Sequence, residues 1–256
     1  MNRTALITGS TSGIGYSIAV SFAKEGYNIM FHGLEANGSE LAEDVARKYK
    51  IKAAFSNANL MKEDAVEELL NSTKEHFGKI DVLINNAGIQ YVSAIEVFPS
   101  EKWNQILAVN LTSVFLASKG VWNGMKENKF GRIINISSVH GLRASEYKSA
   151  YVAAKHGVIG LTKVLALEGA GYNITCNAIC PGYVKTPLVE GQIKDQAKAH
   201  NLSETEVVEK IMLKKQAVKE FISADKIGEL ALFLANENAS AITGSSFTMD
   251  GAWTAQ

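Results

Sequence analysis

A glycine-rich turn near the start of the chain most restricts how the chain can fold. The β-like run Thr4–Thr8 leads directly into Gly9-Ser-Thr-Ser-Gly13-Ile-Gly15, and a helix is predicted from Ile14 to Lys24. Glycines let the backbone turn tightly and approach a pyrophosphate, while the helix N-terminus offers amide donors and a positive dipole end. Because a strand precedes the glycines and a helix follows them, the pattern predicts a dinucleotide-binding unit.

Strand-like and helix-like stretches alternate along the rest of the chain. The expected strands are 28–32, 52–56, 82–84, 133–136, 174–179 and 247–249, and the expected helices are 39–49, 62–77, 101–123, 149–167 and 224–234. This alternation predicts an α/β, Rossmann-like, doubly wound parallel sheet. The 256 residues contain no repeat or linker, so residues 1–256 are expected to form a single dinucleotide-binding and catalytic domain.

The stretch 188–219 is charged and helix-like and has little core pattern. We expect it to form a helical lid, because mobile segments of this kind close over the substrate in many enzymes. An ordinary helical hairpin on the surface is the alternative interpretation.

Composition narrows the expected partners and location. A formal net charge of zero gives no reason to expect nucleic acid or an anionic membrane as a partner. The sequence has no run of 18 or more apolar residues, so no membrane span is expected. No signal segment precedes the first strand, so a cytoplasmic location is expected.

Cys176 and Cys180 fall about 13 Å apart along one predicted strand, too far for a disulfide. They are expected to be reduced core residues, with no metal site.

A serine, a tyrosine and a lysine form the candidate catalytic group. Ser138 follows a predicted strand, and Tyr151 and Lys155 lie one turn apart on the same face of a predicted helix. A free phenol has a pKa of about 10, and a neighbouring ammonium favours the phenolate. We expect Lys155 to lower the pKa of Tyr151, and Ser138 to hydrogen-bond the oxygen that gains or loses a proton.

The end of the second strand predicts which dinucleotide is bound. The sequence there is His32-Gly-Leu-Glu35, which offers no cation for a 2′-phosphate, and Glu35 would repel one, so NAD is expected. Leu34 is expected to pack beside the adenosine. Asn59 either bonds the adenine amino group or is a turn residue, and the small residues from Asn86 to Gly88 leave room for the cofactor.

Asn110 falls in the middle of a predicted helix, where asparagine is mildly unfavourable. Three roles are open for its side chain. The first role is a hydrogen bond to a backbone carbonyl, the second is to hold a water molecule near Lys155, and the third is simply to face solvent.

Together these motifs resemble the short-chain dehydrogenase/reductase family over nearly the whole chain. The resemblance implies that Tyr151 is the general base or acid, that Lys155 binds the nicotinamide ribose, that Ser138 holds the substrate oxygen, and that Asn110 supports the proton relay. The cofactor-contacting positions that we expect are Gly9, Thr11, Gly13, Ile14, Gly15, Leu34, Asn59, Leu60, Asn86, Gly88, Tyr151, Lys155, Pro181, Gly182, Val184 and Thr186.

Several segments resemble a narrower family, the bacterial D-3-hydroxybutyrate dehydrogenases. These segments include Asn86–Gln90, Lys148–Lys155 and Asp250–Thr254. The resemblance implies reversible, NAD-dependent oxidation of (R)-3-hydroxybutyrate to acetoacetate. It also implies a carboxylate site formed by Gln90, His140, Lys148 and Gln192, although Lys148 and Gln192 taken singly suit a solvated surface.

Two alternatives to this function are a reductase of a 3-oxoacyl thioester or a sugar alcohol, and a non-catalytic dinucleotide sensor. By analogy with the family, a homotetramer is expected. The small-residue face of helix 149–167 would suit close packing on the sheet or on another subunit.

Overall fold

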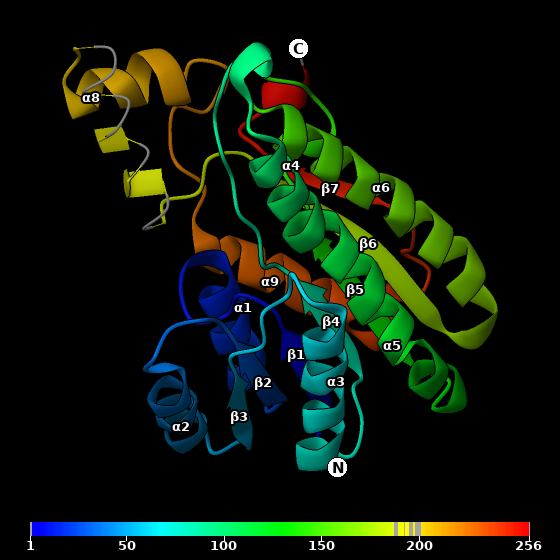
Figure 1. Cartoon of the computed structure of the whole chain (residues 1–256). Coiled ribbons are helices and arrows are strands. Elements are labelled where there is room, and N and C mark those ends of the chain that lie inside the picture. Colours follow the sequence, from blue (N-terminus) through cyan, green and yellow to red (C-terminus); the bar gives the residue numbers. More distant parts are fainter. Residues whose placement is uncertain (1, 187–188, 192, 195–196, 198–200, 256) are drawn as a thin grey trace.

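The computed structural model describes residues 2–186, 189–191, 193–194, 197 and 201–255. Its centre is a parallel seven-stranded sheet in the order β3-β2-β1-β4-β5-β6-β7 (Figure 1). The strands are β1 Thr4–Ile7, β2 Asn28–His32, β3 Ala53–Ser56, β4 Val82–Asn85, β5 Gly131–Ile136, β6 Ile174–Pro181 and β7 Ser246–Met249. The predicted doubly wound sheet is therefore confirmed.

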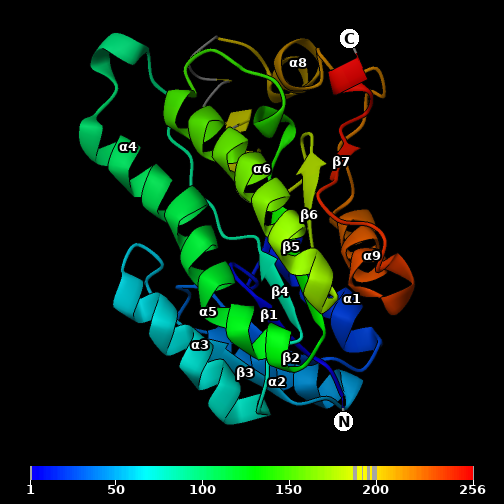
Figure 2. The ribbon, with the colours of Figure 1, turned by 90° about the vertical axis from the view of Figure 1, so that its right-hand side faces the viewer.

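Helices cover both faces of the sheet (Figures 1 and 2). They are α1 Gly13–Lys24, α2 Gly38–Tyr49, α3 Glu63–Phe77, α4 Ser100–Leu107, α5 Ser113–Glu127, α6 Ser149–Gly169, α8 Glu204–Val207 and α9 Ala224–Ala235. On one face α1, α2 and α9 pack their apolar side chains against β1 and β2. On the other face α3, α5 and α6 bury a second cluster. Alternation of side chains along each strand supplies both cores.

The sheet reverses its strand order at β1, which pairs with β2 on one side and with β4 on the other. Ligands of open α/β sheets bind at such a switch point, beyond the carboxyl ends of the strands. The glycine turn after β1 and the loop after β4 meet there, so the topology places the predicted cofactor residues together.

The helix predicted over 101–123 is interrupted in the structure. Between α4 and α5 the residues Ala108–Thr112 form a π-helical turn, η2, centred on Asn110. Such turns are rare and frequently mark functional sites. Asn110 is fully buried there, which excludes the alternative in which its side chain faces solvent.

Helix α6 lies on β6, but its buried small residues pack closely against α4 and the π-helical turn, neither on the sheet nor on another subunit as expected. Ala150 and Ala154 are fully buried, and a Cβ at Gly157 would lie 2.9 Å from the Leu111 side chain. By length and composition α6 with the following turn would suffice to cross a membrane, but 44% of that window is already buried inside the protein. Packing against β6 accounts for its apolar character.

The predicted lid region has a small apolar core of its own. Val189, Val207 and Met212 are buried together, which its charged composition did not indicate. Helix α8 begins with a capping box between Ser203 and Glu206, and a π-helical turn, Val208–Met212, follows it. Both views place α8 beyond the edge of the sheet to which the strands point (Figures 1 and 2). Gln192, predicted to bind substrate from this region, lies outside the described residues.

Candidate active site

The glycine turn is built so closely that side chains would not fit. A Cβ at Gly15 would lie 2.1 Å from the carbonyl oxygen of Gly9, and a Cβ at Gly9 would lie 2.9 Å from the Cα of Ala87. Gly9 and Gly13 also have positive φ values of 62° and 56°. Asn86 Nδ2 donates to the carbonyls of Thr8 and Gly9, at 2.9 and 2.8 Å. Asn86 therefore fixes the turn from the neighbouring strand.

An elongated cavity of about 580 Å³ runs from this turn to the candidate catalytic residues. Nearly every predicted cofactor residue lines it, from Leu34 at one end to Tyr151 at the other. Two do not: Gly15 is packed behind the turn, and Val184 lines a smaller neighbouring cavity instead. A glycine at position 15 thus serves helix–strand packing, while the other predicted positions face the space a cofactor would fill.

Glu35, Leu34 and Asn59 lie together at one end of this cavity. The Thr11 hydroxyl donates to the Glu35 carboxylate at 2.5 Å, and this hydrogen bond lowers the pKa of Glu35. Leu34 is 72% exposed, so it is available to cover a bound group. The Asn59 Oδ1 accepts the Met61 amide at 3.1 Å, so its oxygen stabilises a turn. A carboxylate and an exposed leucine fit the ribose and base of an adenosine.

Ser138, Tyr151 and Lys155 meet at the other end, as predicted. Ser138 follows β5, and its hydroxyl hydrogen-bonds the Tyr151 phenol, which lowers the tyrosine pKa. The first turns of α6 carry Tyr151 and Lys155, with the ammonium 5.6 Å from the phenol ring centroid. A proton donor or acceptor and a hydroxyl that supports it thus share one wall.

The prediction that Lys155 lowers the pKa of Tyr151 is wrong for the chain by itself. Burial raises the pKa of Tyr151 to about 12, and the hydrogen bond from Ser138 only partly opposes it. The Lys155 ammonium donates to the Ile136 carbonyl at 2.8 Å, and burial lowers the pKa of this lysine to about 8. In the chain by itself, burial therefore outweighs the hydrogen bond from Ser138 and favours the neutral phenol.

Asn110 fixes the loop that follows β4. Its Oδ1 accepts the Ile89 amide at 2.8 Å, and its Nδ2 donates to the Ile89 carbonyl at 2.9 Å. Of the three roles open to it, bonding a backbone carbonyl is the one observed. The π-helical turn brings this side chain inward, and the loop it holds carries Gln90 into the catalytic region.

A smaller cavity of about 130 Å³ adjoins Tyr151 and Ser138 and is lined by Gln90, His140 and Lys148. The Lys148 ammonium lies 3.2 Å from His140 Nε2, and burial lowers the pKa of Lys148 to about 8. Burial and the charge of Lys148 lower the pKa of His140 to about 3, so its ring is neutral. Gln90 Nε2 and His140 Nδ1 are buried without a hydrogen-bond partner among the described residues. Three of the four predicted carboxylate ligands are therefore together.

Sequence reasoning missed several residues of the two cavities. Tyr183 and Trp253 stack with ring centroids 5.8 Å apart and wall the smaller cavity with apolar surface. Lys215 lies near them, 5.7 Å from the Trp253 ring, and lowers the pKa of Lys148. His32 lines the longer cavity. The aromatic residues follow strand ends, which was an available signal, whereas the position of Lys215 in the lid region gave none.

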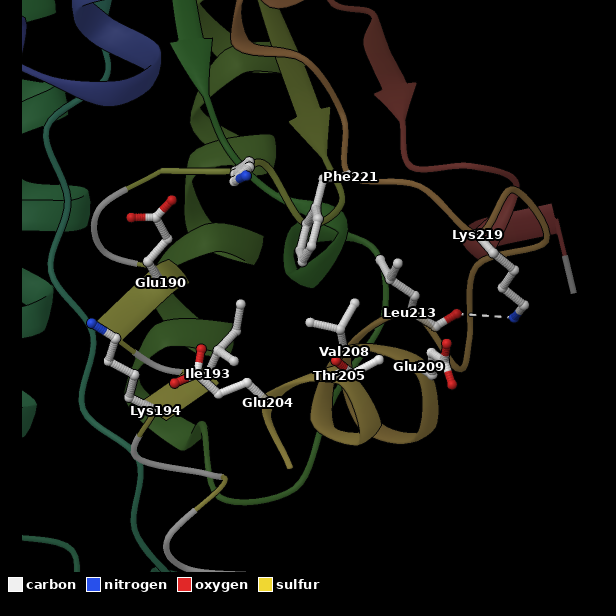
Figure 3. A pocket seen from close by; sticks show the side chains of 11 residues that line it. Glu190, Ile193, Lys194, Glu204, Thr205, Val208, Glu209, Leu213, Lys219 and Phe221 are labelled. Atoms are coloured by element: carbon white, nitrogen blue, oxygen red, sulfur yellow. Dashed lines mark hydrogen bonds between the residues drawn. The ribbon is translucent and has the colours of Figure 1, made fainter. Parts of the chain in front are cut away.

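Another cavity, of about 750 Å³, lies elsewhere, and residues of α8 line part of it (Figure 3). Apolar side chains, including Ile193, Val208 and Phe221, form its walls, and glutamates and lysines surround them. It shares no lining residue with the two cavities above and contains none of the candidate catalytic groups. The chemistry therefore belongs to the cavities at the strand ends.

Comparison with known proteins identifies the family. Residues 3–197 match the family described as short chain dehydrogenase. The chain belongs to the short-chain dehydrogenase family. The D-beta-hydroxybutyrate dehydrogenase of Rhizobium meliloti (strain 1021) is 48% identical over 100% of both chains. The protein of the same name from Cupriavidus necator is 45% identical over 99% of this chain and 98% of its own.

A solved structure supports the same assignment. An actinorhodin polyketide ketoreductase variant, crystallised with NADPH, superposes with a TM-score of 0.93 at 31% identity, covering 98% of this chain and 97% of the ketoreductase. As a short-chain dehydrogenase, the chain is an oxidoreductase whose fold serves a nicotinamide dinucleotide. The glycine turn that excludes side chains, with the elongated cavity beside it, fits such a group.

Proposed function

We propose that this short-chain dehydrogenase reversibly oxidises (R)-3-hydroxybutyrate to acetoacetate with NAD. The observation that carries the proposal is the buried group of Lys148, His140 and Gln90 beside the Tyr151 phenol. A buried ammonium and the Gln90 amide nitrogen, which has no partner among the described residues, favour an anion, because charge-assisted hydrogen bonds are the strong ones. The full-length similarity to proteins named D-beta-hydroxybutyrate dehydrogenase supports the same substrate.

Cavity size argues for a short hydroxy acid over the alternatives. The smaller cavity, about 130 Å³, is far smaller than the 580 Å³ cavity beside it, and the rings of Trp253 and Tyr183 line it. A carrier-linked thioester carries no free carboxylate for Lys148 and needs an open channel. A sugar alcohol is neutral and would leave the ammonium uncompensated.

The residues would divide the reaction as follows. The glycine turn, Glu35 and Lys155 would hold the dinucleotide, and NAD⁺ when bound supplies a hydride acceptor and a positive charge near the phenol. Tyr151, once ionised, takes the proton of the C3 hydroxyl, and Ser138 hydrogen-bonds the same oxygen. Lys148 and its neighbours hold the carboxylate, which orients C3. In the reverse direction Tyr151 returns the proton to the ketone oxygen.

The direct test is NADH formation with each enantiomer of 3-hydroxybutyrate. We expect turnover of the R enantiomer and little of the S enantiomer, because the carboxylate and hydroxyl sites fix two of the substituents at C3. Turnover of only the S enantiomer, or only of neutral alcohols, would contradict the proposal. Reduction of a 3-oxoacyl thioester with NADPH at a higher rate would favour the thioester alternative, and dinucleotide binding without any turnover would favour a sensor.

The preference for NAD is expected to depend on the Glu35 charge. The carboxylate is anchored by Thr11 and ionised at neutral pH, so it opposes a 2′-phosphate. The Glu35→Gln variant should narrow the NAD-over-NADP ratio of kcat/KM by about tenfold. Glu40→Gln, an exposed change on α2, is the control and should leave the ratio unchanged. Equal use of both dinucleotides by the unmodified enzyme would contradict the assignment.

Substrate affinity is expected to weaken in alkaline solution. Burial lowers the pKa of Lys148 to about 8, so its ammonium is present below that pH and is lost above it. The Ki of acetate as a competitive inhibitor should be constant from pH 6 to 7.5 and rise by up to about tenfold per pH unit beyond 8. In the Lys148→Met variant the Ki of acetate should be high and independent of pH. A Ki that does not change with pH in the unmodified enzyme would show that Lys148 does not bind the anion.

Assembly and location complete the proposal. Phe115 on α5 and Val164 and Leu167 on α6 expose 47%, 50% and 83% of their surfaces on neighbouring helices (Figure 2). We propose that these helices mediate a homotetramer, which light scattering would test.

Both cysteines are buried and free, which suits a reducing, cytoplasmic compartment. We propose only a small-molecule substrate, with neither nucleic acid nor a membrane as partner.

A further inference from the structure

His32, the last residue of β2, occupies an unusual position for an ionisable side chain. It is only 3% exposed, and it lines the elongated cavity between the glycine turn and the segment that follows β3. The proposed mechanism gives it no part. A buried polar ring at the edge of a cofactor cavity needs partners, and both of its nitrogens have one.

The two hydrogen bonds fix the protonation state of the ring. The Gly9 amide donates to Nδ1 at 3.0 Å, so Nδ1 is an acceptor. Nε2 lies 2.8 Å from the Ala58 carbonyl oxygen, which only accepts, so Nε2 carries the hydrogen. His32 is therefore neutral, and one imidazole joins the backbone of the glycine turn to the backbone beside Asn59.

The backbone of His32 adds to this connection. The Ser10 amide donates to the His32 carbonyl at 2.7 Å, and the His32 amide donates to the Ser10 hydroxyl at 3.0 Å. The position of the turn after β1 thus depends on His32 at three points, two of them on the main chain and one on the ring. Only the ring bond can be changed by protonation.

We propose that His32 is a positioning residue of the dinucleotide site, which holds the glycine turn and the segment after β3 at the correct separation, and releases the turn when its ring is protonated. An imidazolium has a hydrogen on both nitrogens, so it cannot accept from the Gly9 amide. The amide would then be left without a partner next to a positive charge. Dinucleotide affinity should therefore fall in acid.

The surroundings agree with a neutral ring at physiological pH. Burial lowers the pKa of His32, and the charge of Glu35 opposes this only in part. The turn from Gly9 to Gly15 and the segment 57–61 contain no ionisable side chain, so Glu35 on the loop after β2 is the charged group that faces the ring. Affinity should be constant above about pH 6.5, the ordinary pKa of histidine, and be lost only as the pH falls through the lower pKa of the buried ring.

This inference rests on the dinucleotide part of the proposed function and not on the identity of the hydroxy acid. The experiment measures the Kd of ADP-ribose by calorimetry from pH 5 to 8, because ADP-ribose contains neither a nicotinamide nor a reacting group. Three proteins are compared: the unmodified enzyme, His32→Asn and His32→Leu. An asparagine amide accepts at one atom and donates at another but does not titrate, whereas leucine does neither.

We expect the unmodified enzyme to bind with constant affinity above neutrality and to weaken about tenfold or more at the acid end. His32→Asn should bind within a fewfold of the unmodified enzyme at pH 7.5 and show no acid loss. His32→Leu should bind at least about tenfold more weakly at every pH, with its kcat at saturating NAD largely retained.

Three results would overturn the inference: the same acid profile in the unmodified and Asn proteins, unweakened binding by a folded Leu variant, or no binding of ADP-ribose by any of the three. Circular dichroism at each pH separates unfolding from loss of affinity. The failure of the proposed substrate would appear differently, as intact ADP-ribose binding without turnover of 3-hydroxybutyrate.

Discussion

The Tyr151→Phe variant is expected to lose at least about 10³-fold in kcat in both directions while it still binds NAD. The phenol lines the catalytic cavity and hydrogen-bonds Ser138, which places it to exchange a proton with the substrate oxygen. Phenylalanine fills the same volume, so packing at the start of α6 should be preserved. The loss would therefore report proton transfer and not folding.

Controls for this variant are available on the same chain. Tyr172→Phe removes a phenol from a 42% exposed residue in the turn that follows α6, which lines neither cavity, and should leave kcat unchanged. Quenching or transfer of fluorescence on NADH binding would show that the cofactor cavity is intact. If Tyr151→Phe retains more than a tenth of kcat, another group moves the proton and the mechanism is wrong.

The Lys148→Ala variant is expected to lose about 10²-fold in kcat/KM for acetoacetate reduction, mostly through KM. Hydrogen bonds to charged groups contribute about 1.5–3 kcal/mol, and the loss of the charge also leaves a buried carboxylate without a counter-ion. The effect should be confined to the anion. Methyl acetoacetate, which has no carboxylate, should be reduced by the variant and the unmodified enzyme at similar kcat/KM.

The matched control is Lys163→Ala, which removes an exposed lysine from the same region of the chain, on α6. It should change neither substrate. An equal loss for the acid and the ester in Lys148→Ala would mean that Lys148 supports the fold of the site instead of binding the carboxylate. The comparison thus separates recognition from structure without a crystal of the complex.

The apolar pattern and the turn residues of each segment predicted most of the fold, because the local preference of each segment agrees with the element that it forms. The strand 28–32 has the same bounds in sequence and structure, since apolar residues fill it and Gly33 follows it. The helix predicted over 101–123 differs in detail, because a π-helical turn interrupts it at Asn110, whose side chain hydrogen-bonds Ile89 on the loop after β4. Long-range partners of this kind leave no mark on neighbouring residues.

Spacing and family resemblance predicted which residues form the site, but they did not predict the pKa values of those residues. Tyr151 and Lys155 stand together as expected, but burial raises the phenol pKa, a property of the whole fold. His32 was read only as part of a strand end, because its two partners lie 23 and 26 residues away. Trp253, which lines the substrate cavity, and Lys215 beside it come from the C-terminal part of the chain, far in sequence from Tyr151.

The connection from Asn86 back to the glycine turn has a consequence for synthesis on the ribosome. The Asn86 amide that donates to the Thr8 and Gly9 carbonyls is synthesised 78 and 77 residues after them, respectively. A nascent chain that has emerged only through β3 has its turn but not the strand that holds it, because β4 inserts beside β1 afterwards. Parallel pairing across such a separation is slow to form. We therefore expect the growing polypeptide to bind no nucleotide before its fourth strand has left the exit tunnel.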